Sequence, residues 1–339
     1  MQFSKLISVA RREACKRAGR AVMGVALVGA MGYAQAQTYP DRPITFIVPF
    51  PAGTAADLSA RLFAAEMGRI LNQSIVVQNR TGAGGGIAAA QVARAAPDGY
   101  TVLVGSLGTH VFNKGLYKNL PYDPVKDFVP VSRFFSVANV LVVRSSLGIS
   151  NFGQFVELAK KQKDKPLSYG SAGAGTSAHL SGAQLAQLTG VELLHVPFQA
   201  TPASINELLA GRIDIVFGNI NIVLPHVKSG SLKALAITTA ARSPLMADVP
   251  TVTEVGIPQA EVSTWGGLFL PAGTPHAIAV TLNNAVRKAS VESEAIKKSA
   301  DESGSMVETD PSPEAFARQL KADSDKWLPV IRVTRASAD

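Results

Sequence analysis

The stretch VPFPAGTAADLSARLF, residues 48–63, joins a predicted strand to a predicted helix through a turn of small side chains. The apolar run ITFIVPF, residues 44–50, predicts a buried strand, and apolar residues recur at helical spacing after Asp57. Small residues allow a ligand to approach the backbone, and the free N–H groups of a helix's first turn attract anions. We therefore weigh an anion-accepting backbone against a plain tight turn in which Asp57 stabilises the helix start.

A second joint of the same kind occurs in LSYGSAGAGTSAHL, residues 167–180. Its strand ends near Tyr169, six small residues follow, and a helix is predicted from Thr176. If the two joints face each other, a carboxylate between them accepts several backbone hydrogen bonds without any arginine. Each charge-assisted bond contributes about 1.5–3 kcal/mol. The pair of joints therefore predicts a cleft that binds a carboxylate.

Short β-branched runs alternate with helical patterns along most of the chain. Residues 44–106 follow a βαβαβ order, and a second alternating series begins at about residue 140. Such alternation predicts an α/β fold with doubly wound parallel sheets, and the layout fits two lobes better than one. Thr201-Pro202 and Gly211 are the start and stop signals of one helix, and the tail from about residue 275 predicts two amphipathic helices.

The N-terminal residues have the pattern of a secretory signal peptide. Residues 1–20 carry six Lys or Arg and one acid, residues 21–31 are apolar, and Ala34-Gln35-Ala36 is a small-x-small cleavage pattern. We predict removal of residues 1–36 and export to a bacterial periplasm. Ordinary Sec export is the expected route. Arg11-Arg12 makes the twin-arginine route the alternative. It ranks second because no apolar pair follows the two arginines.

Removal of this segment changes what the composition implies. The whole chain has 33 basic and 25 acidic side chains, and the predicted mature chain keeps 27 and 24. The basic excess therefore belongs mostly to the signal peptide, so a nucleic-acid or membrane-surface partner loses its main support. The only cysteine, Cys15, leaves with it, which excludes a disulfide or a thiolate metal site. No later apolar run approaches 18 residues, and we expect a soluble monomer.

Several look-alike motifs fail on inspection. Gly173-x-Gly175-x-x-Ala178 loosely matches a dinucleotide fingerprint, but no acid ends the next strand to bind a ribose. The five histidines lack metal-ligand spacing, so we predict neither metal nor cofactor. His110 and His179 are the histidines best placed for a cleft. Asn219 ends a predicted strand, where open α/β sheets bind ligands. The aromatic candidates to line the cleft are Phe50, Phe198, Phe217 and Trp265.

Several long motifs in one order strongly resemble the substrate-binding receptors of tripartite tricarboxylate transporters, also called Bug receptors. The matching stretches are VPFPAGTAADLSARL, VVQNRTGAGGGIAAAQVARAAPDGYTVLVGS, LPYDPVKDFVPVS, LSYGSAGAGTSAHL, FGNINIVLPHVKSGSLKALAITTAARSPLMADVPTVTEVG and GGLFLPAGTP. The resemblance extends from about Tyr39 to the C-terminus.

The resemblance implies a two-lobed periplasmic binding protein (type II-like) whose lobes are joined by two crossover strands. Lobe 1 would comprise residues 37–139 and 259–339, and lobe 2 residues 140–258. Such receptors capture organic acids, often dicarboxylates, and deliver them to membrane permease subunits. The implied carboxylate clamp is Pro51, Ala52, Gly53, Thr54, Ala55, Ala56 and Asp57, with Ser171, Ala172, Gly173, Ala174, Gly175 and Thr176. The implied wall around the distal end of the ligand is Ser106, Thr109, His110, Phe198, Gly218 and Asn219.

This sequence departs from the family pattern at two places. The first joint usually has a run of glycines and then Thr or Ser before Asp, whereas here Ala55-Ala56 precede Asp57. A strand end that usually reads Phe-Asp-Asn is Phe217-Gly218-Asn219 here. Because the missing acid removes negative charge near the distal end, we infer a ligand without an ammonium group, either a dianion or an aromatic acid.

Two other functional classes stay open from the sequence. A periplasmic serine hydrolase would use Ser171 or Ser106 with a histidine, but a nucleophile-elbow pattern and a positioned His–Asp pair are missing. A ligand sensor that works with a signalling protein would use the same binding lobes as a transport receptor. The leading hypothesis is a non-enzymatic receptor for a small carboxylate.

Overall fold

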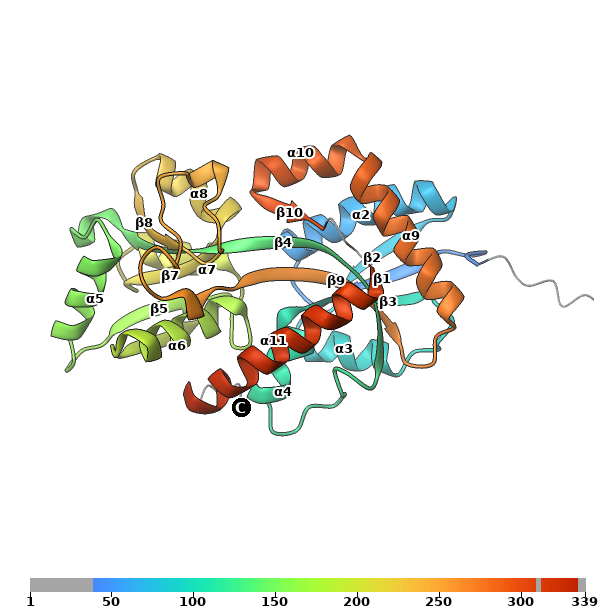
Figure 1. Ribbon diagram of the computed structural model, residues 1–339, viewed down its shortest axis with the longest axis horizontal. Helices are drawn as coiled ribbons and strands as arrows, with labels where there is room; N and C mark the ends of the chain where they lie inside the picture. Colours follow the sequence, from blue (N-terminus) through green and yellow to red (C-terminus); the bar gives the residue numbers. More distant parts are fainter. Residues whose placement is uncertain (1–38, 309–311, 335–339) are drawn as a thin grey trace, which may run out of the picture. The chain divides into compact units, whose positions relative to one another are not determined.

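The computed structural model describes residues 39–308 and 312–334 (Figure 1). The predicted signal peptide, including Cys15, lies outside the described residues. Arg42–Asp339 groups as one unit, to which all the elements below belong. In the two described stretches, no helix has both the length and the apolar character that crossing a bilayer requires.

The described chain contributes ten strands to one mixed sheet. The strands are β1 (Ile44–Val48), β2 (Ile75–Asn79), β3 (Thr101–Ser106), β4 (Phe128–Arg144), β5 (Leu167–Ser171), β6 (Leu193–Pro197), β7 (Ile215–Asn219), β8 (Leu232–Ile237), β9 (Ser263–Pro271) and β10 (Ser305–Val307). Their hydrogen-bonded order is β2-β1-β3-β9-β4-β7-β5-β6, and β8 and β10 also pair with β4.

Two groups of parallel strands are joined through an antiparallel pair. β1 is parallel to β2 and β3, and β5 is parallel to β6 and β7. β9 pairs antiparallel with β3 and β4, while the second half of β4 pairs antiparallel with β7 and β8. Figure 1 shows β4 and β9 running side by side between the two groups. The predicted α/β fold with crossover strands is confirmed, although the sheet is mixed.

Helices follow most strands. The α-helices are α2 (Ala55–Leu71), α3 (Gly86–Ala93), α4 (Asn113–Leu116), α5 (Phe152–Lys161), α6 (Ser177–Thr189), α7 (Thr201–Leu209), α8 (Ile220–Lys228), α9 (His276–Glu292), α10 (Glu294–Ser303) and α11 (Pro313–Thr334). The 3-10 turns are η1 (Ala83–Gly85), η3 (Ser145–Leu147), η4 (Pro244–Met246) and η5 (Pro258–Ala260), and η2 (Gly108–Phe112) is a π-helical turn.

The predicted helix boundaries agree with local capping signals. α7 begins with Thr201-Pro202 and ends before Gly211, which adopts a left-handed φ of 71°. The tail differs from the prediction, because it holds three helices and β10 instead of two helices. The periodic stretch after residue 275 is interrupted at Ser293, whose hydroxyl accepts a hydrogen bond from the N–H of Ile296 and starts a new helix.

The buried side chains form two main clusters. One gathers residues from β1, β3, β9 and α11, such as Leu103, Trp265 and Trp327. The other gathers residues from β4, β5, β7 and α5, such as Phe155 and Ile215. Leu180 of α6 belongs to the first cluster, and α6 contacts α11 as well as β5, β6 and β7. The predicted lobe boundaries stay a prediction.

Candidate functional site

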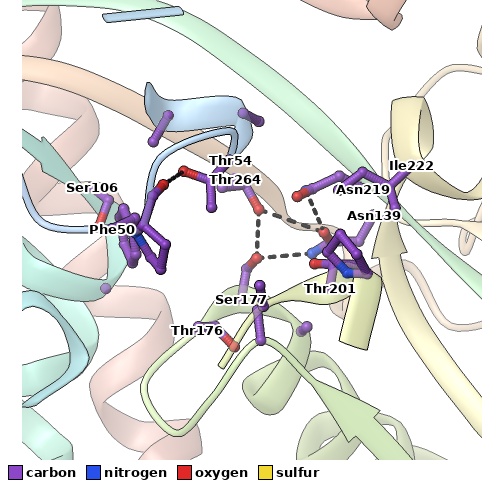
Figure 2. A pocket seen from close by; sticks show the side chains of 18 of the residues that line it. Phe50, Thr54, Ser106, Asn139, Thr176, Ser177, Thr201, Asn219, Ile222 and Thr264 are labelled. Carbon is purple, nitrogen blue, oxygen red and sulfur yellow. Dashed lines mark hydrogen bonds between the residues drawn. The ribbon is translucent and has the colours of Figure 1, made fainter. Parts of the chain in front are cut away.

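A cavity of about 160 Å³ opens at the carboxyl ends of the parallel strands (Figure 2). This is the edge at which open α/β sheets bind ligands. The described residues that line it are Phe50, Pro51, Ala52, Gly53, Thr54, Ala55, Ala56, Ser106, Leu107, Gly108, Asn139, Ala172, Gly175, Thr176, Ser177, Ala178, Gln199, Ala200, Thr201, Pro202, Phe217, Asn219, Ile222 and Thr264.

Four helix N-termini meet at this cavity. The N-cap residues of α2, α6, α7 and α8 are Thr54, Thr176, Ala200 and Asn219, and all four line it. None of the described lining residues is Asp, Glu, Lys, Arg or His. Because first-turn N–H groups have no intrahelical partner and the helix dipole is positive there, the cavity attracts an anion through its backbone.

The first joint is held in shape by its own polar groups. The Thr54 hydroxyl donates to the carbonyl of Pro51 at 2.9 Å and accepts from the N–H of Asp57 at 3.4 Å. This cap occupies the third N–H of α2 and leaves those of Ala55 and Ala56 to the cavity. The glycine at position 53 has a φ of 81°, which an alanine would adopt only with strain.

Asp57 lies beneath this loop and not in the cavity. Its carboxylate is 1% exposed and accepts hydrogen bonds from the N–H of Gly53 at 2.9 Å and from Asn79 Nδ2 at 2.8 Å. Arg61 Nε lies 3.1 Å from both carboxylate oxygens. Burial alone would raise the pKa of Asp57, but the bonds from Arg61, Asn79 and Gly53 outweigh burial and lower it. The charged carboxylate therefore organises the loop that lines the cavity.

The second joint has the same cap and a different support. The Thr176 hydroxyl donates to the carbonyl of Gly173 at 2.8 Å and accepts from the N–H of His179 at 3.3 Å. Beneath the loop, Ser171 Oγ lies 2.7 Å from His195 Nε2, and the ring of His195 stacks on that of His179 with centroids 4.1 Å apart. A neutral histidine pair supports this loop where a carboxylate supports the first.

Four polar side chains bond to one another along the cavity wall in Figure 2. Asn139 Nδ2 donates to Ser177 Oγ at 2.9 Å, and Asn219 Nδ2 donates to Asn139 Oδ1 at 3.0 Å. The hydroxyl of Thr264 is hydrogen-bonded to that of Ser177. We call these four residues the Asn139 network. It links β4, β9, α6 and the start of α8 through one buried amide.

The structure brings together twelve of the twenty residues predicted from sequence as ligand contacts. Those in the cavity lining are Phe50, Pro51, Ala52, Gly53, Thr54, Ala55, Ala56, Ser106, Ala172, Gly175, Thr176 and Asn219. Those outside it are Asp57, Thr109, His110, Ser171, Gly173, Ala174, Phe198 and Gly218. Ligand contact itself stays a prediction for all of them.

His110 belongs to the core beside the cavity. Its ring is 3% exposed and stacks on Phe269 with centroids 3.5 Å apart. Thr109 Oγ1 lies 2.9 Å from His110 Nδ1 and accepts from the N–H of Ser106. Both side chains therefore connect η2 to the core and to the end of β3. Burial lowers the pKa of His110 to about 3, which keeps the ring neutral.

Gly218 is outside the cavity because other side chains fill the space in front of it. A Cβ at Gly218 would lie 2.5 Å from Val223 Cγ1 and 3.3 Å from Thr201 Cγ2. The methyl groups of Val223 and Thr201 therefore occupy the position where the family pattern has an acid.

Sequence reasoning missed the lining residues supplied by the crossover strands and by the start of α7. Asn139, Thr264 and Thr201 are the main polar members of this set. A helix start was predicted at Thr201, and this was a usable signal. Asn139 and Thr264 lie within strands, where the sequence does not reveal which face meets the cavity.

The Ser171–His195 contact does not have the surroundings of a hydrolase site. Ser171 has 0% exposure, and its hydroxyl is also bonded to the backbone of Gly173. His195 packs between the rings of His179 and Tyr169. A nucleophile needs access to its substrate, and Ser171 has none here. Within the described residues, no cluster of three His, Cys, Asp or Glu is arranged to hold a metal ion.

Comparisons with known proteins give one family and several similar chains. The model of a family described as "Tripartite tricarboxylate transporter family receptor" matches residues 59–335. A relative from Pseudomonas sp. strain P51, named as a UPF0065 protein in the tcbD-tcbE intergenic region, is 36% identical, with 94% of this chain and 95% of that protein covered. Protein BugT of Bordetella pertussis is 33% identical, with 93% and 97% covered.

Solved structures with the same fold include two that carry ligands. The Rhodopseudomonas palustris protein MatC with bound malate has a TM-score of 0.80 and 34% identity, with 86% of this chain and 100% of that chain covered. R. palustris Rpa4515 with adipate has a TM-score of 0.80 and 33% identity, with 88% and 99% covered. The periplasmic binding protein BugD has a TM-score of 0.80 and 33% identity, with 88% and 99% covered.

Replacing Asp57 by Ala should lower the free energy of unfolding by about 1–3 kcal/mol, because the N–H of Gly53, the amide of Asn79 and the guanidinium of Arg61 lose a buried acceptor. Guanidinium unfolding at pH 7 measures the loss. The control is Glu157→Gln, an exposed position of α5 at which a change within about 0.5 kcal/mol is expected. Equal effects of the two substitutions would contradict the assigned role of Asp57.

Acidification should destabilise the fold below about pH 6.5, the usual histidine pKa in an unfolded chain. Burial lowers the pKa of His110 to about 3 and that of His179 to about 4. Below about pH 6.5 the unfolded chain therefore binds protons at these histidines that the folded chain does not bind. Stability is therefore fully present above pH 6.5 and falls as the pH drops toward 4, by at most about 1.4 kcal/mol per pH unit for each histidine.

Unfolding measured at pH 7, 6 and 5 tests this dependence. His179→Gln should flatten the decline, while the same change at the exposed His276 should leave it as in the wild type. An unaltered decline in His179→Gln would show that the group responsible lies elsewhere.

Proposed function

This chain belongs to the tripartite tricarboxylate transporter receptor family, and on that basis we propose that it captures a small organic carboxylate in the periplasm and delivers it to the membrane permease of such a transporter. It is a solute-binding receptor by family, and in this proposal it makes and breaks no covalent bond. Family and structural neighbours that are binding proteins support this assignment.

The observation that carries the proposal is the convergence of four helix N-termini on a cavity without ionisable lining side chains. A carboxylate at α2 and α6 would accept from the N–H groups that the Thr54 and Thr176 caps leave free. Each bond to a charged acceptor contributes about 1.5–3 kcal/mol, and each helix dipole about 0.3–1 kcal/mol. A cationic ligand would meet the same dipoles with the opposite sign.

The dimensions of the cavity restrict the ligand to a small molecule. Its volume of about 160 Å³ is close to that of an apolar protein cavity of about 150 Å³ that accommodates benzene. A chain of about six carbons or a single ring with a carboxylate therefore fits. The adipate and malate bound to two structural neighbours are of this size and class.

We further propose that ligand binding draws two lobes together about β4 and β9, with lobe 1 in residues 37–139 and 259–339 and lobe 2 in residues 140–258. The two capped joints follow different groups of parallel strands, so a carboxylate bonded to both connects the groups. Gly108 of η2 and Gly175 of the second joint are in close contact at the cavity, where a Cβ on Gly108 would lie 2.7 Å from the carbonyl oxygen of Gly175. Such an approach requires the two groups to be drawn together.

A thermal-shift screen of residues 37–339 against carboxylic acids tests the proposed function. A ligand at about 100 times its dissociation constant should add roughly 2.7 kcal/mol of stability. The panel contains aliphatic dicarboxylates, tricarboxylates, aromatic acids and amino acids, with the corresponding amides as uncharged controls. Stabilisation by acids and not by amides is expected, and equal shifts from both would contradict carboxylate recognition.

Gly108→Ala should weaken carboxylate binding about tenfold or more while leaving the fold intact, because its methyl group displaces the Gly175 carbonyl from the closed position. Calorimetric titration with the best acid from the screen measures the effect. Gly153→Ala in α5 is the matched control, since its Cβ would meet only Asn151 Oδ1 at 3.4 Å. Unchanged affinity in Gly108→Ala would contradict the proposal that closure requires the Gly108–Gly175 contact.

A further inference from the structure

Thr201 differs from the other buried polar residues that line the cavity, because its hydroxyl has no hydrogen-bond partner among the described residues. The residue is 7% exposed, lines the cavity, and makes none of the bonds of the Asn139 network. Figure 2 shows it beside Asn139 and Asn219, at the end of the cavity opposite Phe50 and Ser106. The hydroxyl oxygen itself is not fully buried and can be reached from the cavity, so we expect its partner to come from the ligand.

The surrounding backbone adds a second donor at the same place. Thr201 is the first residue of α7, and its N-cap, Ala200, has no side chain that could accept a first-turn N–H. Pro202 has no N–H, and the N–H of Ala203 bonds to the carbonyl of Ala200 at 3.1 Å. Helix geometry leaves the N–H of Thr201 without an intrahelical partner. Hydroxyl and N–H of one residue thus form a pair of donors.

Gly218 explains why the threonine is held in this position. The Thr201 methyl group packs over Gly218, where an added Cβ would lie only 3.3 Å from it. An acid at position 218, which the family pattern has, would occupy this space and supply an acceptor. In this chain, Gly218 supplies no acceptor, and the hydroxyl and N–H of Thr201 supply donors in its place. The cavity end therefore changes from one that fits an ammonium group to one that fits a second acceptor.

We infer that Thr201 is the specificity-determining residue of this cavity, and that its hydroxyl donates to a carboxylate or carbonyl at the end of the ligand remote from α2. This inference rests on the proposed function, since it presumes that the first carboxylate is bound at α2 and α6. A ligand with a methyl end leaves the Thr201 hydroxyl buried and unpaired. A ligand with an ammonium end brings its N–H donors against the N–H of Thr201 and the positive end of α7. Both are rejected relative to a dianion.

The test uses ligands that differ only at the remote end. The probes are adipate, hexanoate and 6-aminohexanoate, with succinate, butyrate and 4-aminobutanoate as the shorter set, titrated calorimetrically into residues 37–339. In the wild type, the dianion of the better-fitting set should bind at least about tenfold more tightly than its two analogues. Thr201→Val should reduce this preference about tenfold, because it weakens binding of the dianion and removes the hydroxyl that the monocarboxylate leaves unpaired.

Thr201→Ser is the matched control, because it keeps the hydroxyl and should retain most of the preference. Thermal unfolding of the unliganded variants checks that each one folds. The inference is overturned if Thr201→Val weakens the dianion and the monocarboxylate equally, or if an amino acid binds most tightly; in either case the receptor function stands. Absence of binding by all six probes and by the wider acid panel would overturn the receptor function together with this inference.

Discussion

The antiparallel pairing of β4 with β9 is the constraint on which the cavity depends. The two parallel groups of strands end in separate sets of helices, and this pair joins the two groups within the sheet. Side chains alternate between faces along each strand, so Asn139 faces the cavity while its neighbour Ala138 faces the other side. A shift of one residue in β4 would remove the buried amide that links both strands to α6 and α8.

An anion site built from backbone groups has different requirements from one built on arginine. Peptide N–H groups do not change rotamer, so they provide binding energy only if their loops are rigid before the ligand arrives. The first loop gains this rigidity from the buried Asp57 carboxylate, and the second from the stacked pair His179 and His195. The charge of Asp57 is balanced by Arg61 behind the loop, which leaves the positive helix end free to act on the ligand.

The sequence predicted the two joints well because their signals are local. Thr54 and Thr176 are helix caps that accept an N–H three residues later, and small residues before each cap are visible without any tertiary information. His110 follows a strand end as a cleft residue would, but its stacking on Phe269 depends on the pairing of β3 with β9. Asn139 lies in a strand buried on both faces, so the sequence has no alternation of polar and apolar residues to show which face lines the cavity.

Thr201 and Gly218 show why ligand preference is harder to predict than anion binding. The glycine is visible as a departure from the family pattern, and by itself it indicates only a lost charge. Its consequence depends on Val223 and on Thr201, because methyl groups of both side chains fill the space that a Cβ at position 218 would enter. Neither Thr201 nor Gly218 is among the described residues that are hydrogen-bonded to the Thr54 and Thr176 hydroxyls. The remote end can therefore change its chemistry while the carboxylate clamp keeps its geometry, which allows one scaffold to serve ligands that share a single acid group.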